Sequence, residues 1–184
     1  MITVVPDTFT KVDYDPATIA DLAAGALALV PELPETLDLE IDVDEDAATS
    51  RFSIASLDPL VLAVDSGAFE DYKRPRELGE LATSIAITRL LLEVVDRLDP
   101  GFGAPELDDD VSQAHTQAWD VNLYARVGRL GLRLHQPRFR YNFRNRHGFT
   151  DAADRVFDQL WVADGLTWVR ITELSDRALA PVST

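Results

Sequence analysis

The segment from Arg76 to Leu98 constrains the fold most, because it combines helical spacing with a broad apolar surface. One side of the expected helix carries the apolar residues Leu78, Leu81, Ile85, Leu92 and Val95. Ile87, Leu91, Val94 and Leu98 extend this apolar surface sideways. Arg89 and Glu93, four residues apart, leave only a narrow polar strip. A helix that is apolar over so much of its surface must be buried, so we predict a central core helix packed against a sheet.

Strand patterns precede this helix. Residues 38–44 alternate strictly between apolar and acidic side chains, which predicts a half-buried strand with an acidic outer face. Two further candidate strands, 51–56 and 59–65, are separated by the turn signal Asp58-Pro59. The simplest arrangement of these strands is an antiparallel meander.

Helical patterns dominate the rest of the chain. Further helices are expected over residues 15–30, about 111–134 and 150–163, and a strand over 166–171. The fold class is therefore α+β: a small, mainly antiparallel sheet packed against helices, with a helical C-terminal half. The length of 184 residues suits a single domain over residues 1–184.

The composition bounds the class of protein. With 46% hydrophobic and 27% charged residues the chain is typical of a globular protein. It has no cysteine, so disulfides are excluded, and no secretory signal or apolar stretch long enough to span a bilayer. We expect a soluble, cytoplasmic protein with no membrane partner. The formal charge of −15 also disfavours nucleic acid as a partner.

The charge is divided unevenly along the chain. Residues 121–150 carry seven arginines and no acidic residue, a net charge of +7, so the rest of the chain carries −22. Lys11 and Lys73 are the only lysines. Arg126, Arg129 and Arg133 recur at helical spacing and are expected on one face of the helix over 111–134. Any account of function must explain what neutralises this segment.

The pattern after Pro137 changes period. Phe139, Tyr141 and Phe143 alternate with arginines, which predicts a strand with an aromatic side and an arginine side, although an extended loop also fits. Arginine suits bidentate contact with phosphate or carboxylate, and interleaved aromatic rings can stack on a ligand. The predicted site for an anionic ligand or acidic protein partner comprises Arg133, Arg138, Arg140, Tyr141, Arg144, Arg146 and His147.

A structural role is the alternative interpretation of the same arginines. They could pair with acids of the chain itself, and the 38–44 strand would be the neatest partner if it lay beside the arginine strand. A homodimer joined through acidic and basic faces is also possible. The leading hypothesis is nonetheless a non-enzymatic binding or interaction domain.

Catalytic and metal motifs are sparse. The three histidines lack the spacing of a helical metal pair, and no phosphate-binding loop or nucleophile elbow occurs, so no metal or cofactor is expected. The rival hypothesis is a hydrolase with an unfamiliar site that uses His115, Asp120 and His147.

The order of elements between Asp15 and Leu98 resembles that of minimal zincin-type metallopeptidases. The layout consists of a helix ending near Leu29-Val30-Pro31-Glu32, an acidic strand 39–44, a strand 60–64, and a long helix entered through Arg74-Pro75-Arg76-Glu77-Leu78. In that family the long helix carries the zinc motif His-Glu-x-x-His, and residues 88–92 stand here in its place without any of the three essential residues. The resemblance implies a zincin-like scaffold without metal or peptidase activity.

Overall fold

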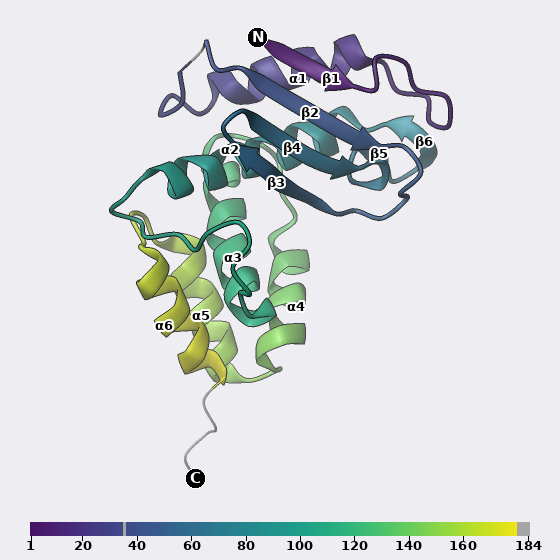
Figure 1. Cartoon of the computed structure of the whole chain (residues 1–184). Coiled ribbons are helices and arrows are strands. Elements are labelled where there is room, and N and C mark those ends of the chain that lie inside the picture. The colour runs from purple at the N-terminus through teal and green to yellow at the C-terminus, as the bar shows by residue number, and fades with distance from the viewer. Residues whose placement is uncertain (35, 180–184) are drawn as a thin grey trace. The chain divides into compact units, whose positions relative to one another are not determined.

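The computed structural model describes residues 1–34 and 36–179, which form two compact units, Met1–Val95 and Asp96–Thr184. The elements of unit 1 are β1 (Ile2–Val5), α1 (Pro16–Ala28), β2 (Leu39–Asp44), β3 (Phe52–Leu57), β4 (Leu60–Asp65), the short 3₁₀ helix η1 (Ser66–Ala68), β5 (Glu70–Asp71), β6 (Arg74–Leu78) and most of α2 (Glu80–Leu98). Unit 2 contains α3 (Gln113–Arg129), α4 (Gln136–His147), α5 (Asp151–Val162) and α6 (Trp168–Leu179). The predicted α+β class and the helical C-terminal half are confirmed (Figure 1).

The main sheet of unit 1 is mixed. Its strand order is β1-β2-β4-β3, with β1 parallel to β2, β2 parallel to β4, and β3 antiparallel to β4. The hairpin across Asp58-Pro59 is therefore confirmed, but the meander in chain order is wrong, because β4 lies between β2 and β3. The connection from β1 to β2 runs through α1, as parallel strands require a crossover. A separate antiparallel pair is formed by β5 and β6.

Each face of the sheet follows from the alternation in β2. Leu39, Ile41 and Val43 are buried, whereas Glu40, Asp42 and Asp44 are exposed, as the sequence pattern predicted. The N-cap of helix α1 is Asp15, whose carboxylate accepts hydrogen bonds from the backbone N–H groups of Ala17 and Thr18. In Figure 1 this helix passes behind the strands.

Helix α2 is buried at every residue from Ala86 to Val94. The predicted polar strip is also buried: Arg89 and Glu93 form an ion pair with side chains only 7% and 9% exposed. The guanidinium group of Arg89 lies 5.6 Å from the ring centroid of Phe52 on β3. Residues 76–78, predicted to begin the helix, belong instead to strand β6.

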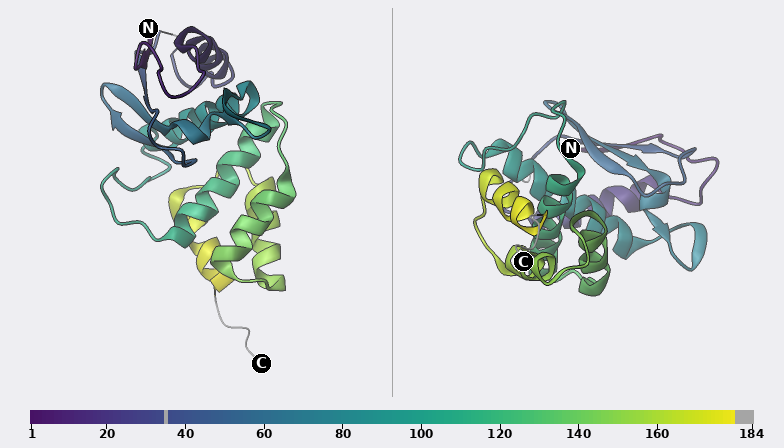
Figure 2. Two further views of the ribbon diagram at one scale, coloured as in Figure 1. Left: turned by 90° about the vertical axis from the view of Figure 1, so that its right-hand side faces the viewer. Right: turned by 90° about the horizontal axis from the view of Figure 1, so that it is seen from below.

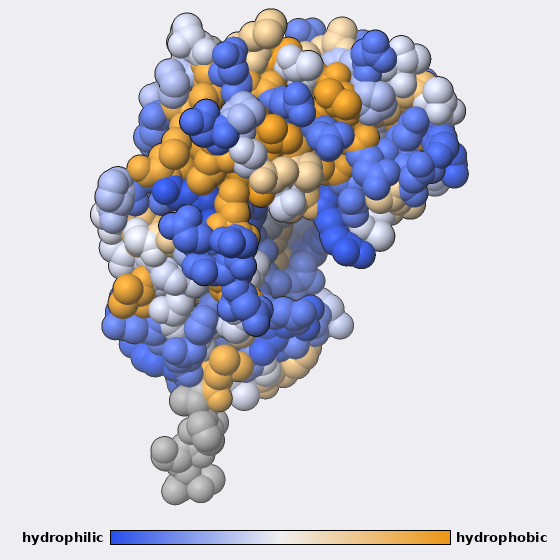
Figure 3. Space-filling model, in the orientation of Figure 1, coloured by the Kyte–Doolittle hydropathy of each residue, from blue (hydrophilic) through white to orange (hydrophobic). Residues whose placement is uncertain are grey.

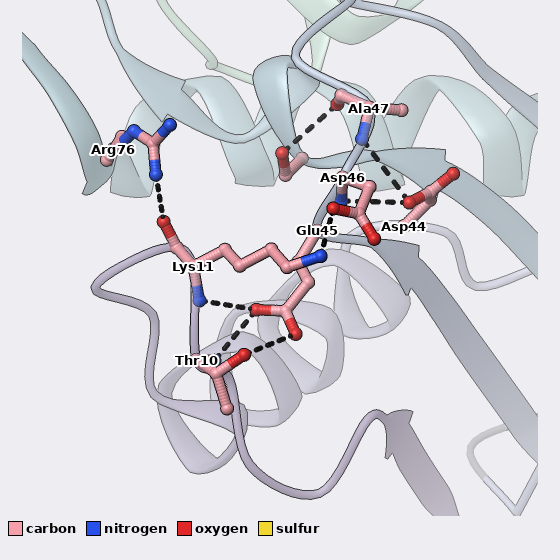
Figure 4. Close-up of polar contacts among 8 residues, drawn as sticks. Thr10, Lys11, Asp44, Glu45, Asp46, Ala47 and Arg76 are labelled. Carbon is pink, nitrogen blue, oxygen red and sulfur yellow. Dashed lines mark hydrogen bonds and ion pairs between the residues drawn. The ribbon is translucent and has the colours of Figure 1, made fainter.

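A polar clasp joins the loop after β1 to the turn after β2 (Figure 4). The Glu45 carboxylate accepts hydrogen bonds from the backbone N–H groups of Thr10 and Lys11, each at 2.7 Å. The Lys11 ammonium group pairs with Asp46, and the Lys11 carbonyl oxygen accepts a bond from Arg76 at 2.7 Å. The backbone bonds hold the pKa of Glu45 below its ordinary value.

The core of unit 2 is built from four helices that lie side by side in Figures 1 and 2. Helix α3 contacts α4, α5 and α6, and α5 contacts both α4 and α6. The largest buried side chains come from every helix: Trp119, Leu123, Phe143, Phe157, Leu160, Ile171 and Leu174. The helix predicted over 150–163 is confirmed as α5, and its N-cap is Thr150, whose hydroxyl accepts a bond from the Ala153 N–H at 3.1 Å. The strand predicted over 166–171 is wrong, because α6 begins at Trp168.

Candidate binding surface on helix α4

The arginine and aromatic segment is a helix, so the strand predicted after Pro137 is wrong. Helix α4 runs from Gln136 to His147, and Pro137 occupies its first turn, where a missing N–H group is tolerated. Arg144, Arg146 and His147 lie in the last turn, near the negative end of the helix dipole. Arg133 lies in the loop before α4, because α3 ends at Arg129; the predicted common face of Arg126, Arg129 and Arg133 is therefore wrong.

One side of α4 packs into unit 2 through aromatic side chains. Phe143 and His147, four residues apart, are buried and stack with ring centroids 3.8 Å apart. Phe143 also meets the ring of Phe157 on α5 edge to face, at a centroid distance of 5.9 Å. This contact fixes which residues of α4 point to solvent.

Arg140 and Arg144, two predicted site residues, pair with carboxylates of α5. Arg144 makes a bidentate contact with Asp154, at 2.7 Å from Nε and 2.6 Å from Nη2. Arg140 pairs with Asp158, lies 3.7 Å from Asp154, and stacks over the ring of Phe157 with 4.4 Å to the centroid. The hydrogen bond from Arg144 is the main reason why the pKa of Asp154 is lowered. These two arginines therefore attach α4 to α5.

The arginines of α3 are also paired inside unit 2. Arg126 lies 2.6 Å from the buried Asp96, and Arg129 lies 2.9 Å from Asp164. The structural interpretation therefore holds for four of the seven arginines, but with different partners from those expected. The 38–44 strand was the predicted partner because two strands could pair directly; α4 is a helix and has no such ladder.

His147, the seventh predicted site residue, is not at the surface. Its Nδ1 atom lies 3.1 Å from the carbonyl oxygen of Phe143, and its Nε2 atom lies 2.7 Å from the hydroxyl oxygen of Ser175 on α6. Burial lowers the pKa of His147, and neighbouring His115 lowers it further. Ser175 is 0% exposed, so this serine and histidine pair cannot reach a substrate in this conformation.

Two residues of the rival hydrolase set, His115 and His147, have partners on α6. The Nε2 atom of His115 lies 2.8 Å from an oxygen of Asp176, which follows Ser175 on α6. The sequence pattern does not single out Ser175 or Asp176, because it predicts a strand over 166–171 and no helix beyond it. The helical signal that could have identified this helix is the spacing of Ile171, Leu174 and Ala178, on whose face Ser175 lies four residues after Ile171.

The opposite side of α4 is open and has no acidic residue. Arg138, Tyr141, Asn145 and Arg146 are exposed there, and we call these four residues the α4 outer face. Within residues 1–34 and 36–179, Arg138 and Arg146 form no ion pair, and neither does exposed Arg133. Tyr141 is 58% exposed, and its ring lies 5.9 Å from that of Phe149, which is 64% exposed. The face thus combines unpaired positive charge with exposed aromatic surface.

No protein-family model, curated protein or solved structure matches this chain. Across the described ranges no three His, Asp or Glu side chains are grouped in a way that could hold a metal ion. In the same residues no helix is both long and apolar enough to cross a membrane.

Proposed function

We propose that this protein is a binding module that presents the α4 outer face to an anionic partner. The observation that carries the proposal is the division of the arginines within one helix. Arg140 and Arg144 are paired with α5, whereas Arg138 and Arg146 point to solvent with no ion pair among the described residues. The predicted site is thereby reduced to Arg138, Tyr141 and Arg146, with Asn145 added; Arg133 lies outside α4, in the loop before it.

The paired arginines Arg140 and Arg144 also favour anion binding by Arg138 and Arg146, because they neutralise nearby acidic side chains. The contacts of Arg140 and Arg144 neutralise Asp154 and Asp158, two carboxylates of α5. A partner that approaches the outer face meets the cationic and aromatic side chains of Arg138, Arg146 and Tyr141, and α4 itself carries no acidic residue. Arginine's planar fork can bind carboxylate or phosphate oxygens in pairs, and Tyr141 supplies apolar area beside it.

The test is binding of fluorescein-labelled poly-L-glutamate, measured by fluorescence anisotropy at low salt. We expect the double variant R138A/R146A to bind at least about tenfold more weakly than the parent protein, because surface electrostatic attraction depends on these two charges. The matched control R155A/R170A removes two arginines from exposed positions on α5 and α6 and should bind like the parent. An equal loss of affinity in both variants would show that net charge alone controls binding, and the proposal would be wrong.

A further inference from the structure

We infer that the partner of the α4 outer face is a second copy of this chain, bound through the acidic outer side of strand β2. The inference rests on the proposed function, since it names the partner of the same surface. Glu40, Asp42 and Asp44 form that acidic side, which we call the β2 strip. The contact joins unit 2 of one copy to unit 1 of the other.

The β2 strip carries the negative charge that complements the arginines of the α4 outer face. All three carboxylates are exposed, and none forms an ion pair within the described part of the chain. The residues that flank Glu40 in the sheet are Thr3 and Val61, and those that flank Asp42 are Val5 and Ala63. No basic side chain on the neighbouring strands therefore competes for these two carboxylates.

The lengths of the two surfaces agree. A strand rises about 3.3 Å per residue, so Glu40 and Asp44 lie about 13 Å apart along β2. A helix rises about 1.5 Å per residue, so Arg138 and Arg146 lie about 12 Å apart along α4. Both arginines lie on one ridge of the helix, at positions i and i+8. Two arginine–carboxylate pairs can therefore form at the same time.

The net charges of the two units favour a contact between unit 2 of one copy and unit 1 of the other. Unit 1 contains six basic and nineteen acidic residues, a net charge of −13. Unit 2 contains eleven basic and thirteen acidic residues, a net charge of −2. An approach that brings two copies of unit 1 together is strongly repelled, whereas the basic face of a nearly neutral unit 2 is attracted to unit 1.

Apolar atoms lie beside the charges on both surfaces. Surface ion pairs alone contribute little, so a stable contact also needs apolar area. Tyr141 supplies it on α4; on the sheet, Val5 is 39% exposed, and Val61 and Ala63 are half-buried. Figure 3 shows hydrophobic atoms among the hydrophilic ones over the strands of unit 1.

The experiment is sedimentation velocity on the full chain at low and high salt, with two charge-reversal variants. The parent protein should associate in a concentration-dependent way at low salt and dissociate as salt is added. R138E/R146E and E40K/D42K should each weaken association at least about tenfold, because each places like charges opposite one another. An equimolar mixture of the two variants should restore a mixed complex.

Matched controls change the net charge equally but at other exposed positions. R155E/R170E corresponds to the arginine variant, and D108K/D110K corresponds to the acidic variant. Both should associate like the parent protein. If these controls lose association to the same extent, or if the mixed variants stay monomeric, a second copy is not the partner.

Two further results separate this inference from the proposed function. A parent protein that stays monomeric at about 100 µM in low salt, where even weak charge attraction acts, yet binds polyglutamate through Arg138 and Arg146, overturns the inference alone. The same monomeric protein binding a labelled DNA duplex through these arginines also overturns it and identifies nucleic acid as the partner. Failure to bind polyglutamate and to associate overturns both proposals.

Discussion

The Nε2 atom of His147 lies 2.7 Å from the hydroxyl oxygen of Ser175, and this buried contact joins α4 to α6. The Nδ1 atom of the same ring faces the carbonyl oxygen of Phe143, which can only accept a hydrogen bond. Nδ1 must therefore carry the proton, so that neutral Nε2 accepts from the Ser175 hydroxyl. The contact fixes both the tautomer of His147 and the position of α4.

Replacement of Ser175 by alanine should destabilise unit 2. The substitution leaves the buried Nε2 atom of His147 without a partner, which costs about 1–3 kcal/mol of unfolding free energy. Urea denaturation followed by circular dichroism measures the loss. Thr116→Ala, at an exposed position of α3, should change the free energy by no more than about 0.5 kcal/mol. A Ser175→Ala protein as stable as the parent contradicts the assigned role.

The stability of the protein should fall as the pH falls below the ordinary pKa of histidine, about 6.5. Because burial lowers the pKa of His147 in the folded state, the unfolded chain binds its proton first. The free energy of unfolding then decreases by up to about 1.4 kcal/mol per pH unit, until the lowered folded pKa is reached.

Denaturation series between about pH 7.5 and about pH 5.5, which span the ordinary histidine pKa, measure this slope. The groups that act on His147 include His115 and Asp176, so His147→Gln is compared directly with the parent protein. The slope should be smaller in His147→Gln. Equal slopes would show that another group titrates.

Removal of Arg144 should lower the melting temperature at neutral pH and matter less in strong acid. The bond from Arg144 lowers the pKa of Asp154, so the stabilising contribution is present above the ordinary aspartate pKa of about 3.9. It is lost as the pH falls through the lowered value, when Asp154 becomes protonated. Thermal melts of Arg144→Ala at about pH 7 and about pH 2, on either side of these values, test this; Arg155→Ala is the control. An equal deficit at both pH values contradicts an ionic origin.

The sequence pattern predicts β2 correctly, because its side chains follow the strand period alone. The prediction is wrong for α4, where the same residues fit both the strand period and the helix period. In β2, Leu39, Ile41 and Val43 alternate with acids, and only a strand explains that order. In α4, Phe139 and Phe143 are two residues from Tyr141 and four from each other, so the alternation also matches a helix. The twelve-residue length of α4, which no local pattern shows, decides between them.

The pairing of distant elements could not be predicted either. Whether Arg140 is free depends on Asp158, eighteen residues away on a neighbouring helix. Charge counting located the segment that contains the candidate surface, but only the helix geometry separates paired Arg144 from open Arg146. The likeness to the zincin-type scaffold stays a prediction; its residues 88–92 lie in the buried middle of α2.

Gly67 should tolerate no side chain. A Cβ atom added there would lie 2.3 Å from the carbonyl oxygen of Ala48 and 2.6 Å from that of Thr49, both backbone atoms. Gly67→Ala should therefore reduce the unfolding free energy by about 2 kcal/mol or more. Gly25→Ala is the matched control, since Gly25 lies in α1 with nothing within 4 Å of the added atom. That control should stabilise the protein by up to about 1 kcal/mol.

The clasp at Glu45 should protect two backbone amides from hydrogen exchange. Glu45→Ala removes the acceptor of the Thr10 and Lys11 N–H groups, so both should exchange faster in the variant. Hydrogen–deuterium exchange followed by NMR resolves the two amides. Glu32→Ala, at an exposed position outside the clasp, should leave their rates unchanged. Unchanged exchange in Glu45→Ala would show that another group protects the loop.

The distribution of lysines has a practical consequence. Lys11 and Lys73 both belong to unit 1, and Lys11 is engaged with Asp46, so unit 2 contains no primary side-chain amine. Lysine-directed fluorophores, biotin tags and sensor-chip coupling therefore modify no side chain of the unit that bears α4. Conversely, an arginine-selective dicarbonyl reagent reacts with the α4 outer face directly, and protection of Arg138 and Arg146 from that reagent becomes a footprint of any partner.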